Sequence, residues 1–184
     1  LRASGIPRLI VADIAGDGTR YLIEAAPEGR QIAVWVRRHE SHDTEASLKA
    51  IQAIGRVFAE CAKVGLFHGD IIPERDLWLD TEGKPQIRGI GALQITGLDR
   101  LPAHNDHAAP ERRYGEPFDQ RADIFSLGSV LCELTRGILL PTGDPSRAAH
   151  NRRGAELLLE RALERATAKS AGERFATWEE FLEA

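Results

Sequence analysis

Short apolar runs separated by polar turns recur twice in the first half of the chain. Leu9–Ala12 and Tyr21–Ile23 flank the turn sequence Gly-Asp-Gly at 16–18. Leu77–Leu79 and Gln86–Arg88 flank a second polar loop that also contains a glycine. Runs this short, bounded by glycine and aspartate, are typical of paired strands. The pattern therefore predicts two β-hairpins.

A helical repeat dominates the segment between the two hairpins. Asp43 or Thr44 is suited to cap a helix that runs to about Lys63, and Gly65 follows as a C-terminal stop. The apolar positions that recur every three or four residues, and so share one face, are Leu48, Ile51, Ile54, Phe58 and Cys61. A shorter helix is predicted before it, at Gln31–Arg38.

The second half of the chain is predicted to be helical only. The segment from Gln120 to Thr135 is apolar nearly all round, which is typical of a buried helix. Another helix is predicted at Ala155–Ala166, and a last one begins at Thr177, where Thr-Trp-Glu-Glu fits a capping box. The stretch from Gly89 to Pro110 shows no clear period, and we expect it to be weakly structured.

Strands near the start and helices elsewhere predict an α+β fold, mostly helical, with the helices segregated. The chain of 184 residues carries a formal net charge of -4, which gives no reason to expect nucleic acid or an anionic membrane as a partner. No run of 18 apolar residues and no signal peptide is present, so we expect a cytoplasmic protein. Cys61 and Cys132 lie in apolar helical patterns and are expected to be buried thiols.

The densest chemical motif is His68-Gly69-Asp70, which follows the long helix directly. Further along come Ala109-Pro110-Glu111, then Asp123 at the start of the apolar helix, and Arg174 before the last helix. In this order and at these spacings, the series resembles the eukaryotic-like protein kinase family. A His-Gly-Asp sequence also resembles small-molecule phosphotransferases with a kinase-like fold, but the Ala-Pro-Glu motif favours the protein kinase side.

The resemblance implies a kinase C-lobe over residues 30–184, with residues 1–29 as a remnant of the N-lobe hairpin and the hinge. It implies that Asp70 is the catalytic base, with His68 beside it, and that Asp123 braces the catalytic-loop backbone. Glu111 and Arg174 would form the buried ion pair of the family. The glycine-rich loop and the lysine strand of the N-lobe have no counterpart in this chain.

The catalytic positions depart from the family pattern. Gly89 stands where the family has the metal-binding aspartate, and glycine has no side chain to bind magnesium. Arg75 replaces the metal-binding asparagine, and a guanidinium has no acceptor. Ile72 replaces the catalytic-loop lysine, and Gly69 replaces the arginine that usually reads phosphorylation of the activation loop. Asp70 alone is retained, so we expect a pseudokinase.

A nucleotide site is a further expectation that follows from the resemblance. The hinge backbone from Glu24 to Ala26 would meet an adenine, with Ile23 at the back pocket and Leu77 as the pocket floor. Arg75 would contact a phosphate directly, so ATP without magnesium is the cofactor to test, and otherwise none is expected. The simpler role for Arg75 is a salt bridge to Asp70 or Asp76, and we favour it.

The function predicted is therefore a regulatory scaffold that binds a protein partner or a second copy of itself. Without the other N-lobe elements, we expect exposed apolar surface at residues 6–24 and around Leu77 to Ile90. The alternative is that the chain is the C-terminal part of a Ser/Thr kinase or a kinase-like phosphotransferase. The sequence starts at Leu1 and contains no methionine, which favours a piece of a longer protein.

Overall fold

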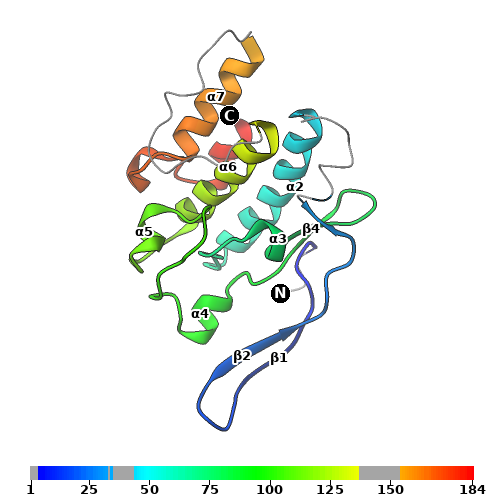
Figure 1. Ribbon diagram of the computed structural model, residues 1–184, viewed down its shortest axis with the longest axis vertical. Helices are drawn as coiled ribbons and strands as arrows, with labels where there is room; N and C mark the ends of the chain where they lie inside the picture. The colour runs from blue at the N-terminus through cyan, green and yellow to red at the C-terminus, as the bar shows by residue number, and fades with distance from the viewer. Residues whose placement is uncertain (1–3, 33, 35–43, 137–153) are drawn as a thin grey trace.

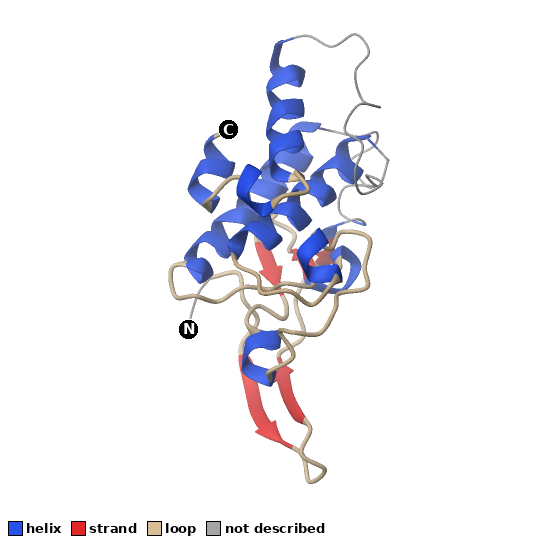
Figure 2. Ribbon diagram, turned by 90° about the vertical axis from the view of Figure 1, so that its left-hand side faces the viewer, coloured by secondary structure: helices blue, strands red, loops and turns tan. Residues whose placement is uncertain are grey.

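The computed structural model describes residues 4–32, 34, 44–136 and 154–184. These residues form a helical body from which a β-hairpin projects at one end (Figures 1 and 2). The helix predicted at Gln31–Arg38 lies largely outside the described residues, as does the capping position Asp43. The mostly helical α+β class predicted from the sequence is confirmed.

The projecting hairpin consists of β1 (Leu9–Ile14) and β2 (Arg20–Glu24), which pair antiparallel. Gly18 in the turn adopts φ 87, a conformation that glycine reaches without steric cost. The first predicted hairpin is therefore confirmed. The two strands form a sheet of their own and join no other strand among the described residues.

A small three-stranded sheet lies under the helices. It has the order β3-β4-β5, with β3 (Arg30–Gln31), β4 (Leu77–Leu79) and β5 (Pro85–Ile87) all antiparallel to their neighbours. The β4–β5 pair confirms the second predicted hairpin, displaced by one residue in its second strand. The sequence did not predict β3, because two residues are too few to show a period.

Four helices agree with the prediction. They are α2 (Thr44–Ala62), α6 (Gln120–Arg136), α7 (Gly154–Ala166) and α8 (Trp178–Glu183). Every residue of α6 from 122 to 132 is buried, as expected of a helix that is apolar nearly all round. The Thr177 hydroxyl accepts the Glu180 N–H at 3.3 Å and so caps α8 as predicted.

The core lies where α2, α6, α7 and α8 meet. Phe58 of α2 stacks on Trp178 of α8 with ring centroids 5.2 Å apart. Gly128 brings α6 against α7, because a Cβ there would stand 2.9 Å from the Cβ of Ala166. Cys61 and Cys132 are buried in this core, and neither forms a disulfide. Burial raises the pKa of Cys61 to about 11, so its thiol is poorly reactive in the folded chain.

The stretch from Gly89 to Pro110 is more ordered than predicted. It contains α4 (Ala92–Thr96), whose caps Gly91 and Gly97 both adopt left-handed conformations. The sequence pattern missed this helix because it is only five residues long. Two other short helices begin with a proline, α3 (Pro73–Asp76) and α5 (Pro110–Arg113). Among the described residues, no helix is long and apolar enough to cross a membrane.

Candidate functional site

Asp123 of α6 holds the His68-Gly69-Asp70 turn in place. Its Oδ2 accepts the His68 N–H at 2.8 Å, and its Oδ1 accepts the Gly69 N–H at 2.7 Å. The carboxyl is buried, and burial raises its pKa, while His68 and the two N–H donors oppose that rise. The backbone brace expected from the family resemblance is therefore present.

His68 lies inside the protein. Its side chain is 3% exposed and packs edge-on against Phe58. Its Nδ1 accepts the Asp70 N–H at 3.3 Å, whereas its Nε2 lies 3.4 Å from Asp76 Oδ2 without completing a hydrogen bond. These contacts assign His68 to the framework of the turn rather than to a surface that a substrate would touch.

Both carboxylate oxygens of Asp70 have partners within the protein. Oδ1 accepts a hydrogen bond from Asn105 Nδ2 at 2.6 Å, and Oδ2 lies 3.5 Å from Arg75 Nη2. The Asn105 Oδ1 atom in turn accepts the His107 N–H at 2.9 Å. Asn105 was not predicted from the sequence, because nothing in the local pattern links it to a residue 35 positions earlier.

Arg75 is turned toward two aspartates. Its Nε and Nη2 donate to the two carboxylate oxygens of Asp76 at 2.6 and 2.8 Å. Nη2 also donates to the main-chain oxygen of Asp70 at 2.9 Å. The hydrogen bonds with Asp76 raise the pKa of the Arg75 guanidinium. The salt bridge that we favoured for Arg75 is present, and it involves Asp70 and Asp76 together.

Arg112 of α5 is a second arginine at this site, and its role was not predicted from the sequence. It is 1% exposed, and its Nε donates to the Gly69 carbonyl at 2.9 Å. Its other nitrogens donate to the carbonyls of Asp99, Leu101 and Glu116. The guanidinium carbon lies 4.2 Å from the centre of the Phe118 ring. Burial lowers the pKa of Arg112, against the pull of nearby carboxylates.

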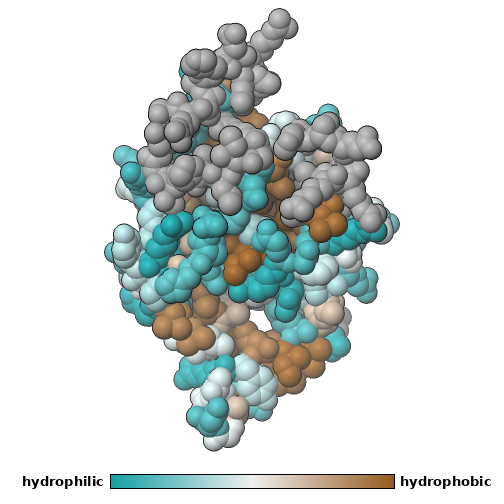
Figure 3. Space-filling view, in the orientation of Figure 1, coloured by the Kyte–Doolittle hydropathy of each residue, from teal (hydrophilic) through white to brown (hydrophobic). Residues whose placement is uncertain are grey.

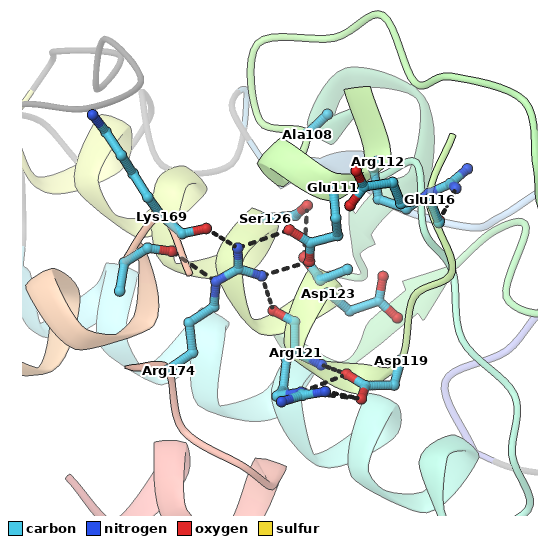
Figure 4. Close-up of polar contacts among 12 residues, drawn as sticks. Ala108, Glu111, Arg112, Glu116, Asp119, Arg121, Asp123, Ser126, Lys169 and Arg174 are labelled. Atoms are coloured by element: carbon cyan, nitrogen blue, oxygen red, sulfur yellow. Dashed lines mark hydrogen bonds and ion pairs between the residues drawn. The ribbon is translucent and has the colours of Figure 1, made fainter. Parts of the chain in front are cut away.

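Glu111, in the first turn of α5, forms a bidentate ion pair with Arg174 (Figure 4). The two Arg174 Nη atoms donate to the two Glu111 carboxylate oxygens at 2.6 and 2.8 Å. The Arg174 side chain is completely buried and also donates to the carbonyls of Ala168, Lys169 and Arg121. The expected pair is therefore present, and it joins α5 to the segment before α8.

Known proteins resemble the chain in both sequence and shape. It is 27% identical over 125 residues to Aurora kinase C of Mus musculus, and 25% identical over 131 residues to integrin-linked protein kinase 1 of Arabidopsis thaliana. The matched regions cover 66% and 64% of this chain. The chain spans 45% and 27% of the length of those two proteins. No protein-family model matches it.

The kinase domain of Mycobacterium tuberculosis PknI superposes on the whole chain with a TM-score of 0.71 at 19% identity, and 71% of that domain is covered. The chain therefore has a protein-kinase-like fold. Its matched part corresponds to the C-lobe, which is where Asp123, Glu111 and Arg174 lie. The framework of the kinase fold thus rests on the same residues that carried the sequence resemblance.

The residues expected to contact a nucleotide differ from one another in exposure and in their partners. The Glu24 carboxylate accepts the N–H of Gly89 at 3.2 Å, so the segment expected to be the hinge is bonded to the position expected for the metal-binding aspartate. Ile23 and Ala26 are exposed, while Leu77 is fully buried. Arg75 bonds to aspartates, as described above. A nucleotide site at these residues stays a prediction.

The exposed surface expected around Leu77 to Ile90 is not found. Leu77, Leu79, Ile87 and Ile90 are all buried in the main core cluster. The expectation was wrong because β3 covers β4 on one side and α2 packs against β5. The hairpin part of the expectation agrees with the structure, since Leu9, Ile10, Ile14, Tyr21 and Ile23 are exposed.

A polar pocket of about 220 Å³ opens beside Asn105. It is lined by Ile72, Glu74, His104, Asn105, Asp106, His107 and Glu133. His107 is buried, with Nδ1 3.2 Å from the Ser129 hydroxyl and Nε2 3.2 Å from Glu133 Oε2. Burial lowers the pKa of His107 below its usual 6.5, although Glu133, Glu74 and Asp106 pull it upward.

The lowered pKa of His107 predicts a loss of stability in mild acid. The folded chain binds the His107 proton less readily than the unfolded chain does. The contribution of His107 to the free energy of unfolding is therefore complete above pH 6.5 and is lost as the pH falls through the folded pKa. We expect His107→Gln to flatten the fall in free energy of unfolding measured by urea titration at successive pH values. His104→Gln is the control, because His104 is exposed, and an equal effect of both variants would contradict the assignment.

Proposed function

We propose that this kinase-like domain is catalytically impaired and acts as a protein-interaction scaffold. The observation that carries the proposal is the pair of contacts made by Arg75. At the position of the family's metal-binding asparagine, a fixed cation donates to Asp76 and to the main chain of Asp70. Phosphoryl transfer depends on metal ions that neutralise the charge of the phosphates, and this position offers a positive charge instead.

The residues present do not fit a magnesium ion. Magnesium takes oxygen ligands in octahedral geometry, commonly from one or two carboxylates. Gly89 contributes no side-chain oxygen, and its N–H is bonded to Glu24. The Arg75 guanidinium lies 3.5 Å from the Asp70 carboxylate, the one carboxylate retained from the family's catalytic set. A divalent cation at Asp70 would therefore meet a neighbouring cation at close range.

Nucleotide binding provides the first test. We expect neither ATP with magnesium nor ATP without it to raise the melting temperature of the chain. A ligand present at about 100 times its Kd would stabilise the fold by about 2.7 kcal/mol, which a thermal scan resolves. An active protein kinase domain in the same buffer serves as the positive control. A rise with ATP and magnesium would contradict the proposal, and a rise with ATP alone would assign Arg75 to phosphate binding.

The surface that supports the scaffold role is the projecting hairpin. Its exposed apolar side chains are Leu9, Ile10, Ile14, Tyr21 and Ile23. Ile95 and Leu98, at and just after α4, are also exposed, and α4 packs against β2. Figure 3 shows hydrophobic residues gathered over this end of the molecule. A two-stranded hairpin alone is marginally stable in water, and exposed apolar patches commonly mark interfaces.

Association through the hairpin is the second test. We expect the chain to self-associate or to bind a hydrophobic dye, and Ile10→Lys with Ile14→Lys to abolish this. Light scattering and dye fluorescence are the measurements. Leu158→Lys is the matched control, because Leu158 is 61% exposed on α7, at the opposite end from the hairpin. A wild-type chain that remains a monomer and binds no dye would contradict the interface.

A second candidate function is that the chain forms part of an active Ser/Thr kinase or kinase-like phosphotransferase. The retained Asp70, whose side chain is 26% exposed, favours it. In a longer protein that carries an N-lobe, Asp70→Asn would then have to abolish phosphate transfer. Unchanged function after that substitution would leave the scaffold as the remaining assignment.

A further inference from the structure

The loop between α4 and α5 is joined to the His68-Gly69-Asp70 turn at two points. Asn105 bonds to the Asp70 side chain, and Arg112 bonds to the Gly69 carbonyl. We propose that Asn105 and Arg112 form a latch that holds residues 97–109 closed over this turn, with Asp70 as its anchor. The proposal rests on the proposed scaffold function, because an anchored Asp70 is not available as a base.

The Asn105 contact occupies the atom that a substrate would need. A catalytic base must accept a proton from a substrate hydroxyl within hydrogen-bond reach. Asp70 Oδ1 is already bonded to the Asn105 amide at 2.6 Å, and Oδ2 has Arg75 beside it. The same Asn105 side chain accepts the His107 N–H, so this one amide group bonds both to the Asp70 side chain and to the main chain of the loop.

Arg112 of α5 provides the second point of the latch. Its guanidinium is buried among the carbonyls of Gly69, Asp99, Leu101 and Glu116, and the Phe118 ring lies against it. A buried cation is costly unless its N–H groups are satisfied, and here four carbonyls satisfy them. Because the acceptors are main-chain oxygens, the latch needs no added phosphate to close.

Two main-chain hydrogen bonds involve the same two residues. The Ala103 N–H donates to the Arg112 carbonyl at 2.8 Å, and the Ala108 N–H donates to the Asn105 carbonyl at 3.2 Å. These two amides, with that of His107, report directly on whether the loop is closed. Exchange of an amide hydrogen requires its hydrogen bond to open, so slow exchange at these positions measures the latch.

Amide exchange followed by NMR tests the latch in the full chain. We expect slow exchange at Ala103, His107 and Ala108 in the wild type. Losing one hydrogen bond should speed exchange at His107 and Ala108 about tenfold in Asn105→Ala and in Asp70→Ala. Asp70→Asn should retain slow exchange, because its amide oxygen still accepts from Asn105. Combining Asn105→Ala with Asp70→Ala should add little to either single change.

Arg112→Gln should speed exchange at Ala103, and Arg100→Gln is its control, since Arg100 lies exposed in the same loop. If Arg112→Gln fails to fold, the Asp70 and Asn105 variants still decide the question. Unchanged exchange in Asn105→Ala, or equal exchange in Asp70→Asn and Asp70→Ala, would overturn the latch. The measurement uses neither nucleotide nor partner, so its failure is distinct from failure of the scaffold.

Discussion

Arg174→Met is expected to lower the free energy of unfolding by about 3–5 kcal/mol, because it leaves a largely buried carboxylate without its partner. Glu111 has only 14% of its side chain exposed and would lose both of its bonds from Arg174. The carbonyls of Ala168 and Lys169 would lose a donor as well. Urea denaturation, with an unchanged slope, measures the loss.

Two further variants test whether the loss comes from the unpaired charge of Glu111. Arg165→Met removes the exposed Arg165–Glu180 pair, whose side chains are 50% and 46% exposed, and should cost less than about 1 kcal/mol. Arg174→Met combined with Glu111→Leu should recover much of the loss, because no unpaired charge remains. If Arg174→Met costs no more than Arg165→Met, the bridge does not staple α5 to the segment before α8.

Gly69→Ala is the second substitution with a large expected effect. Gly69 adopts φ 76, and a non-glycine residue pays about 1–2 kcal/mol for that conformation. An added Cβ would stand 2.4 Å from two atoms of the Phe118 ring, and such overpacking adds about 1–3 kcal/mol. Both costs fall on the turn that Asp123 and Arg112 hold, and urea denaturation measures their sum.

Gly65→Ala isolates the backbone part of that cost. Gly65 has φ 73, and a Cβ there meets nothing within 4 Å, so only the conformational cost should appear. In a Phe118→Leu background, Gly69→Ala should cost less than in the wild type, because the ring contact is relieved. If Gly69→Ala and Gly65→Ala lower the free energy of unfolding equally, the Phe118 ring moves aside without a cost in free energy. The arginine usual in the family at position 69 would meet the same ring.

The sequence by itself determined the framework of this protein. The three- and four-residue spacing predicted α2, and the continuous apolar segment predicted a buried α6, because helix periodicity is a local property. The order of Asp70, Glu111, Asp123 and Arg174 indicated the kinase-like fold before any contact was known. The absence of metal-binding side chains at Gly89 and Arg75 could also be predicted, since it depends only on which chemical groups a residue possesses.

Only the tertiary structure decided what those residues touch. Asn105 meets Asp70 and Arg112 meets Gly69 across 35 and 43 residues, and no local pattern encodes such a meeting. The burial of Leu77 and Ile87 likewise depends on β3 and α2 arriving from elsewhere in the chain. Long-range contacts arise from how the elements pack, so the partners of Asp70 became known only when the loop was seen to close over it.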